Sequence, residues 1–255
     1  MITELTNKVR KLVASLDDAR TRKAEGLFVA EGTKCVLDTI AYFNCRMLFA
    51  TDSWLQRHGK TVSSYMPLTV KKADMERMSH LTTPPEVLAV YEIPDVDIER
   101  INPADELVIA LDRVQDPGNL GTIMRIADWY GIRNIIASHD TVDLYNPKVV
   151  QATMGAISRV NVGYVDLPEY LGALPEGVPV FGTFLDGKNI YSCELAANGV
   201  IVMGNEGQGI SDAVKVHVDK RLFLPSFPAG VATSESLNVG MATAITVAEF
   251  RRRQM

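Results

Sequence analysis

Hydrophobic residues near the start of the chain recur at the spacing of a helix face, at Leu5, Val9, Leu12, Val13 and Leu16. Short apolar runs then alternate with helical segments. The pattern predicts strands over 26–32, 45–51, 66–72 and 86–93, with helices over 33–43 and around 73–81. Alternation of strands and helices at this spacing predicts a small α/β domain.

Residues 93–106 break this pattern. They hold two prolines and several acidic residues, and no hydrophobic period is sustained through them. We interpret the segment as an interdomain linker. The sequence therefore predicts one domain over residues 1–98 and a second over residues 99–255.

The pattern resumes at 107–112 with a continuous apolar run, which is typical of a strand buried in a parallel sheet. Further strands are predicted over 134–138, 159–165, 178–184 and 199–204. Helices are predicted over 119–131, 146–155 and 167–174, and a last long helix over 234–253, with Ser234 as its N-cap. The second domain is therefore expected to be an open, parallel α/β sheet covered by helices.

Composition narrows the class of protein. The chain has 255 residues, 47% of them hydrophobic and 22% charged, with a net charge of −5, as in an ordinary globular protein. No apolar run reaches the roughly 20 residues that span a bilayer, and the charged N-terminus does not resemble a signal peptide. Three scattered cysteines and four isolated histidines form no metal-binding motif. We expect a cytoplasmic protein with no membrane segment and no metal.

Basic residues gather at both ends of the chain, within residues 8–34 and at Arg251, Arg252 and Arg253. Such runs are usually solvated faces. RNA binding is the alternative interpretation, and the charge alone does not decide between the two.

Three loops that follow predicted strands hold the unusual residues, where open α/β sheets bind ligands. In the first, Asn119 stands at a helix start and Arg125 lies among apolar neighbours. Arg125 either forms a structural ion pair, with Asp112 or Asp128, or binds a phosphate or ribose hydroxyl.

The second loop, "GNEGQGIS" over residues 204–211, has the glycines of a ligand-binding loop together with a carboxylate, Glu206. Its spacing equally suits a plain strand-to-helix turn. The third loop ends in Ser236 and Asn238 at a helix start, and capping alone does not require both. No histidine accompanies the serines, which argues against acyl transfer.

Taken in order, "DPGNLGTIMRIADWYG", "VMGNEGQGIS" and "LPSFPAGVATSESLNVGMATA" resemble the three motifs of the SpoU (TrmH-like) family of RNA ribose 2′-O-methyltransferases, in the SPOUT superfamily. The resemblance covers about residues 106–250. The segment "RKLVASLDDARTRKAEGLFVAEGTKCV" resembles the RNA-binding domain that precedes the catalytic domain in many members.

The resemblance implies a parallel-sheet methyltransferase domain with a C-terminal trefoil knot, which binds S-adenosylmethionine and forms a homodimer. Carried over by motif position, the residues implied to line the methyl-donor site are Thr183, Gly204, Gly209, Leu224, Ser236 and Leu237. Those implied to form the reaction centre are Asn119, Arg125, Glu206 and Asn238.

The implied reaction transfers a methyl group to a ribose 2′-oxygen of RNA, ribosomal RNA more than transfer RNA. The family makes the motif-one arginine the general base. Because a guanidinium holds its proton at neutral pH, we expect Arg125 to grip the adjacent phosphate and offset alkoxide charge. Glu206 would hold Arg125 or Asn119 in place. The loop from Pro225 to Ser236 is longer than the family pattern, which leaves its contacts open.

Three rival functions differ from this one. A transfer RNA 2′-O-methyltransferase would carry the same motifs. A nicotinamide dehydrogenase would need GxGxxG in the first βα turn of the second domain, where this chain has "DRVQDPGNLG". A non-catalytic RNA-binding protein that keeps the fold would have no need of the whole set of polar motif residues.

Overall fold

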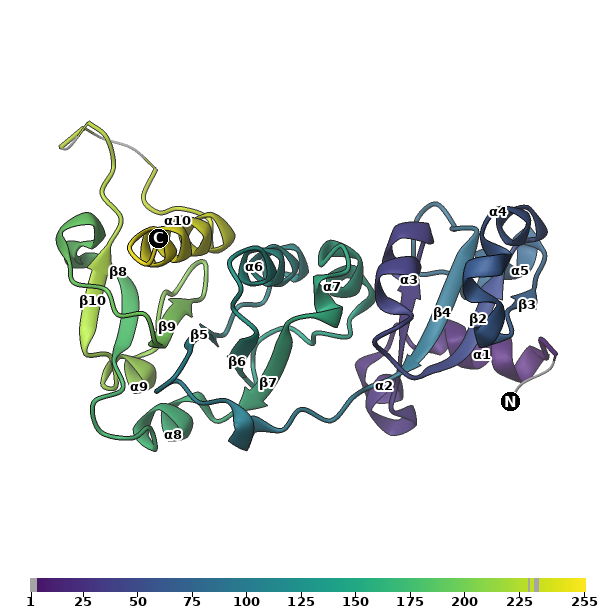
Figure 1. Ribbon diagram of the computed structural model, residues 1–255, viewed down its shortest axis with the longest axis horizontal. Helices are drawn as coiled ribbons and strands as arrows, with labels where there is room; N and C mark the ends of the chain where they lie inside the picture. Colours follow the sequence, from purple (N-terminus) through teal and green to yellow (C-terminus); the bar gives the residue numbers. More distant parts are fainter. Residues whose placement is uncertain (1–3, 229, 232–233) are drawn as a thin grey trace. The chain divides into compact units, whose positions relative to one another are not determined.

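The computed structural model describes residues 4–228, 230–231 and 234–255. The chain forms two compact units, one of Met1–Asp95 with Asp143–Ser158 and one of Val96–Val142 with Arg159–Met255 (Figure 1). A segment from the middle of the second half therefore groups with the first unit, which the sequence did not indicate. The division at residues 98 and 99 stays a prediction.

The first unit is a mixed α/β fold. Its strands are β1 (Leu27–Glu31), β2 (Cys45–Ala50), β3 (Leu68–Thr69) and β4 (Val87–Glu92). They form one sheet in the order β1-β4-β2-β3, in which β4 is antiparallel to both neighbours and β2 is parallel to β3. Its helices are α1 (Asn7–Ser15), α2 (Ala19–Glu25), α3 (Thr33–Thr39), α4 (Asp52–Val62), α5 (Lys72–Met78) and α7 (Pro147–Ala152), with 3₁₀ turns η1 (Ser63–Tyr65) and η3 (Ala156–Ser158).

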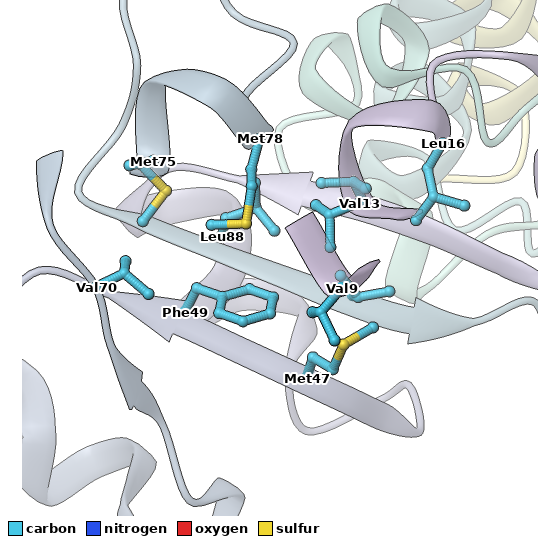
Figure 2. Packing of buried hydrophobic residues seen from close by; sticks show 11 residues of the cluster. Val9, Val13, Leu16, Met47, Phe49, Val70, Met75, Met78 and Leu88 are labelled. Carbon is cyan, nitrogen blue, oxygen red and sulfur yellow. The ribbon is translucent and has the colours of Figure 1, made fainter. Parts of the chain in front are cut away.

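Helices α1 and α5 pack on one face of this sheet. Figure 2 shows Val9, Val13 and Leu16 of the first helical segment against Met75 and Met78 of α5. The helical spacing of the apolar residues produces this buried stripe. Thr6 fixes the start of α1, because its hydroxyl accepts a hydrogen bond from Val9 N at 3.2 Å.

The segment from Asp143 to Ser158 is anchored to the first unit by an ion pair between a buried arginine and a partly exposed carboxylate. Arg22 is only 2% exposed, and its Nε donates to Asp143 Oδ2 at 2.9 Å. The same guanidinium donates to the carbonyls of Leu16 and Asp17. One member of the N-terminal basic run is therefore structural rather than available to RNA.

The second unit contains a six-stranded sheet that is parallel throughout, in the order β10-β8-β9-β5-β6-β7. This confirms the predicted parallel α/β architecture. Its strands are β5 (Leu107–Asp112), β6 (Asn134–Ser138), β7 (Asn161–Val165), β8 (Val180–Asn189), β9 (Gly199–Gly204) and β10 (Lys220–Phe223). Its helices are α6 (Pro117–Trp129), α8 (Leu167–Gly172), α9 (Asp212–Lys215) and α10 (Val239–Arg252), with 3₁₀ turns η2 (Ile98–Arg100) and η4 (Ile190–Ser192).

Helices cover both faces of this sheet, α6 and α10 on one and α8 and α9 on the other (Figure 1). Phe250 of α10 meets Phe181 of β8 edge-to-face, with ring centroids 4.9 Å apart. Helices α6 and α10 run in the same direction. A Cβ on Gly240 would lie 3.1 Å from Thr122 Cγ2 near their starts, and Arg251 Nε donates to Tyr130 O at 2.9 Å near their ends.

Strands β5 and β9 lie side by side at the centre of the sheet, and Asp112 is in register with Gly204 at their carboxyl ends. From β5 the chain continues to β6 on one side, whereas from β9 it continues to β10 on the other. A crevice at such a switch point is where open α/β sheets bind ligands. The fold therefore directs the first and second motif loops to one place.

The last helix begins later than the sequence predicts. Asn238, not Ser234, is its N-cap, and Asn238 Oδ1 accepts from Gly240 N at 2.9 Å and Met241 N at 3.3 Å. Serine and asparagine are equally good caps, so the position is decided by the packing of Gly240 against α6. Within the loop from Pro225 to Ser236, residues 229, 232 and 233 lie outside the described part of the chain. The trefoil knot stays a prediction.

Candidate active site

Three of the predicted catalytic residues form a chain of hydrogen bonds between the motif loops. Asn238 Nδ2 donates to Asn119 Oδ1 at 2.8 Å, and Asn119 Nδ2 donates to Glu206 Oε1 at 2.6 Å. These residues are 119 and 87 positions apart in the sequence. We call Asn238, Asn119 and Glu206 the amide relay.

The direction of the amide relay follows from the start of α10. Asn238 Oδ1 is occupied by two backbone N–H groups, so its Nδ2 must point away from the helix. That amine faces Asn119 Oδ1, which leaves Asn119 Nδ2 to donate to Glu206. A carboxylate accepts but does not donate. Each amide orientation is thus fixed by its hydrogen-bond partners.

Asn119 is held at the start of α6 by the turn before it. Asp116 caps the helix, and its Oδ1 accepts from Asn119 N at 2.8 Å. Pro117 takes the first helical position, which needs no N–H donor. The sequence "DPGN" therefore places Asn119 in the first turn of α6, shortly after the carboxyl end of β5.

The loop that carries Glu206 is a tight turn, and a different structural feature explains each of the two glycines Gly204 and Gly209. A Cβ on Gly204 would lie 2.3 Å from the carbonyl carbon of Gly209, so no side chain fits there. Gly209 has a φ of 68°, and no atom lies within 4 Å of the position of its Cβ. The interpretation of the loop as a close-packed turn is correct for Gly204, whereas Gly209 leaves open space beside the loop.

Arg125 stands apart from the amide relay. It lies six residues beyond Asn119 on α6, about 9 Å along the helix and roughly a third of a turn around it. Its side chain is exposed and makes no hydrogen bond or ion pair within the described residues. The proposed ion pair with Asp112 or Asp128 is wrong, because Asp112 lies beside Arg113 and Asp128 pairs with Arg159.

The residues carried over to the methyl-donor site lie within β8, at or after the carboxyl ends of β9 and β10, and directly before α10. Thr183 and Leu224 are half-buried, and Ser236 is exposed. Leu237 leaves 49% of its surface exposed directly before the amide relay. Thr183 Oγ1 lies 3.8 Å from the sulfur of Met203 in β9. Their assignment to a donor site stays a prediction.

Two further polar residues hold the second motif loop, and the sequence did not single them out. Asn205 accepts from Gly207 N and Gln208 N through its Oδ1, and its Nδ2 donates to Arg113 O at 2.8 Å. Arg113 Nη1 donates to Gln208 Oε1 at 2.9 Å. Asn205 belongs to the motif quoted above. Nothing in the sequence indicates that Arg113 adopts a left-handed backbone, with φ of 61°.

The C-terminal arginines are bound within the second unit. Arg253 Nη2 donates to the carbonyls of Ile190 and Tyr191, at 2.9 Å each. Glu249 is 5% exposed and accepts from Arg252 and Arg253. The hydrogen bond from Arg252 lowers the pKa of Glu249 from 4.5 to about 2, against a smaller opposing effect of burial. This run therefore holds the end of α10.

Among the described residues, no group of three or more His, Cys, Asp or Glu side chains is placed to hold a metal ion. No helix among them has the length and hydropathy to cross a membrane.

Comparison with known proteins relates both parts of the chain to RNA-modifying enzymes. Residues 106–248 match the SpoU rRNA Methylase family, and residues 7–89 match the MRM3-like substrate binding domain. The 23S rRNA (guanosine(2553)-2′-O)-methyltransferase RlmP of Bacillus subtilis (strain 168) is 34% identical over 171 residues. That alignment spans 66% of this chain and 66% of the Bacillus protein's own length.

Solved structures resemble the whole chain. A TrmH-family protein from Porphyromonas gingivalis has a TM-score of 0.88 at 36% identity, covering 98% of this chain and 100% of that one. An AdoMet-bound rRNA methyltransferase from Sinorhizobium meliloti has a TM-score of 0.85 at 28% identity, covering 100% and 98%. The family match extends over more than half of the chain and includes all three motifs, so this protein belongs to the SpoU rRNA Methylase family.

Proposed function

We propose that this protein transfers the methyl group of S-adenosylmethionine to a ribose 2′-hydroxyl of ribosomal RNA. The observation that carries the proposal is the amide relay, which joins Asn119, Glu206 and Asn238 of the three family motifs at the switch point of the sheet. Family membership and the activities named for RlmP and the Sinorhizobium enzyme support the same reaction.

The residues of the predicted donor site suit S-adenosylmethionine. Leu224 and Leu237 offer apolar surface for an adenine ring, since neither is fully buried. The open space beside Gly209 lets a ligand approach the backbone. The sulfonium of the bound donor supplies an electrophilic methyl group. Because this ligand carries a positive charge where a phosphate would be negative, the carboxylate of Glu206 in the loop is compatible with it.

The protein's own part in the reaction is to orient the ribose and offset negative charge on its 2′-oxygen. Arg125 is exposed and has no partner among the described residues, so its planar fork remains available to a phosphate oxygen next to the target ribose. Glu206 holds Asn119 by the 2.6 Å hydrogen bond, not Arg125. Asn119 then presents a fixed amide beside the reacting hydroxyl.

A second copy of the chain fits the outer surface of α6 and α10. Met241 and Ile245 lie one turn apart on α10 and are 55% and 36% exposed, and Trp129 at the end of α6 is 85% exposed. Since α6 and α10 run side by side, these side chains give one apolar surface of the kind that homodimers bury. Sedimentation of Met241→Glu should show a monomer where the natural chain is a dimer. A monomeric natural chain, or an unaffected variant, would contradict this.

The first unit is the part of the chain that we assign to RNA binding, following its match to a substrate-binding domain. An RNA substrate and three free thiols both fit a cytoplasmic location.

The test uses the purified full chain, S-adenosylmethionine with a tritiated methyl group, and separated ribosomal and transfer RNA from cells that lack the gene. We expect label in large-subunit ribosomal RNA, protected from alkaline cleavage at one nucleotide. Asn119→Ala should abolish the labelling, while Arg133→Ala, at an exposed position directly before β6 and so at the amino ends of the strands, should not. Label in transfer RNA alone would identify a transfer RNA enzyme. Donor-independent RNA binding without label would identify a non-catalytic binder.

A further inference from the structure

Arg113 adopts a backbone conformation that arginine rarely takes. Its φ is 61°, in the left-handed region, directly after β5. For a residue with a Cβ this conformation is unfavourable, because the side chain crowds the following carbonyl oxygen. Glycine would avoid that cost, so the arginine side chain and the backbone direction at this position each need a reason.

The backbone direction sends the two peptide groups of Arg113 to different elements. Its N–H donates to Ser138 Oγ at 2.9 Å, at the end of β6. Its carbonyl accepts from Asn205 Nδ2 at 2.8 Å, at the start of the second motif loop. A single residue thereby ties the ends of β5 and β6 to the loop that follows β9.

The side chain of Arg113 reaches the same loop. Nη1 donates to Gln208 Oε1 at 2.9 Å, and Nε lies 3.3 Å from Asp112 Oδ1. The other carboxylate oxygen of Asp112 accepts from Ser211 N at 2.5 Å. Asp112 and Arg113 therefore hold the loop at its beginning, its middle and its end.

Asn205 turns these anchors into a fixed loop. Its backbone exchanges two hydrogen bonds with Gly209, at 3.1 and 2.9 Å, and its side chain caps the N–H groups of Gly207 and Gln208. Glu206 lies between these anchored residues and has no other support than Asn119 within the described part of the chain. Its direction is therefore set by the loop that Arg113 holds.

We propose that Arg113 is a positioning residue for Glu206. It fixes the loop from Asn205 to Gly209 so that the Glu206 carboxylate meets Asn119 Nδ2 before any ligand binds, and so that the amide relay keeps its direction during methyl transfer. The part that concerns catalysis rests on the proposed function. The part that concerns the loop does not.

The test compares Arg113→Lys and Gln208→Leu with the natural chain. A lysine keeps a positive charge beside Asp112 but lacks the fork that reaches Gln208. The leucine removes the acceptor at an exposed position and leaves Arg113 in place. Arg133→Lys is the matched control, because Arg133 is exposed directly before β6, at the amino ends of the strands of the same sheet.

The first readout is amide hydrogen exchange of residues 205–209, measured by NMR and compared with α6. Both variants should raise the exchange rates of Gly207, Gln208 and Gly209 by at least about tenfold, with α6 unchanged. The control should change neither. Unchanged exchange in the loop would overturn the proposal, because the loop would then hold itself.

The second readout is the single-turnover rate of methyl transfer in a double-mutant cycle with Glu206→Gln. Arg113→Lys should lower the rate about tenfold in the natural background, the effect of one charge-assisted hydrogen bond. It should lower the rate less than about twofold when Glu206 is already replaced, because the two act as one unit. Equal losses in both backgrounds would show that Arg113 does not act through Glu206. Faster loop exchange in a protein that labels no RNA would refute the proposed function and leave the loop assignment standing.

Discussion

The arginine in the middle of α6 and the arginines at the end of α10 differ in what surrounds them. Arg125 is exposed and makes no bond within the described residues, although its neighbours Ile123 and Met124 are buried. Arg251 and Arg253 instead donate to backbone carbonyls of other elements. The sequence leaves both cases open: the clustered arginines indicate either a solvated face or an RNA-binding run, and the single arginine indicates either a structural ion pair or a phosphate contact.

The structure separates the two cases. The clustered arginines are bonded within the second unit, to backbone carbonyls at the ends of helical segments and to the buried carboxylate of Glu249. The isolated charge of Arg125 has no partner among the described residues. If Arg125 binds phosphate as proposed, an arginine that the fold does not use will be a better indicator of a phosphate site here than local charge density.

The largest expected effect comes from replacing Arg125, the exposed arginine of this comparison. Arg125→Ala should lower single-turnover methyl transfer by about 10²–10³-fold, the loss of a preorganised charge near the reacting oxygen. The melting temperature should stay within about 1 °C, because Arg125 supports no other residue. Arg125→Lys should recover little, since a point charge does not reproduce the fork. Near-normal turnover in the lysine variant would remove Arg125 from the proposed role.

A smaller effect is expected from removing one hydrogen bond of the amide relay, the one that Asn238 donates to Asn119. Asn238→Asp keeps an acceptor for Gly240 N and Met241 N, and a carboxylate suits a helix start, so stability should not fall. It cannot donate to Asn119, which then faces carboxylates on both sides. We expect about a tenfold lower turnover, the effect of losing one hydrogen bond.

The control for this variant is Asn238→Ala, which removes both the cap and the donor. It should lower turnover similarly and also destabilise the protein by about 1 kcal/mol. If Asn238→Asp turned over RNA normally, the direction of the relay would have no catalytic importance.

The smallest effect comes from the carboxylate that pairs with the arginines at the end of α10, and it concerns stability alone. The pKa of Glu249 is lowered to about 2 by Arg252 and Arg253, so its contribution to stability is present above its unfolded pKa and is lost as the pH falls from about 4.5 towards 2. Glu249→Gln should lower the free energy of unfolding at pH 7 by about 1–2 kcal/mol. Urea unfolding at pH 7, 4 and 2.5 should show the difference from the natural chain shrinking, with turnover at pH 7 unchanged.

Much of the second unit could be read from the sequence. The apolar runs of β6 and β9 predict strands over 134–138 and 199–204, and the structure has both strands at these bounds. The reason is that strands buried on both faces of a parallel sheet are nearly continuous apolar runs, so the ends of the run mark the ends of the strand. The motif resemblance identified the family, and the structure brought Asn119, Glu206 and Asn238 together. Whether the donor-site residues and Arg125 act as proposed stays a prediction.

The remaining features depend on choices that the sequence leaves open. Glu206 could have met Arg125 or Asn119, and only the exit of β9 beside β5 decides for Asn119. The start of α10 depends on where Gly240 packs against Thr122. Arg113 was missed because propensity disfavours its left-handed backbone, and long-range hydrogen bonds to Ser138 and Asn205 overrule that preference.

The grouping of Asp143–Ser158 with the first unit bears on how such proteins can exchange parts. The chain passes between the two units three times, at residues 95–96, 142–143 and 158–159. A transplant of residues 1–95 onto another methyltransferase would leave the 2%-exposed Arg22 without the carboxylate of Asp143, and an unpaired buried charge is costly. A chimera intended to redirect methylation would therefore need both residues 1–95 and residues 143–158 of this chain.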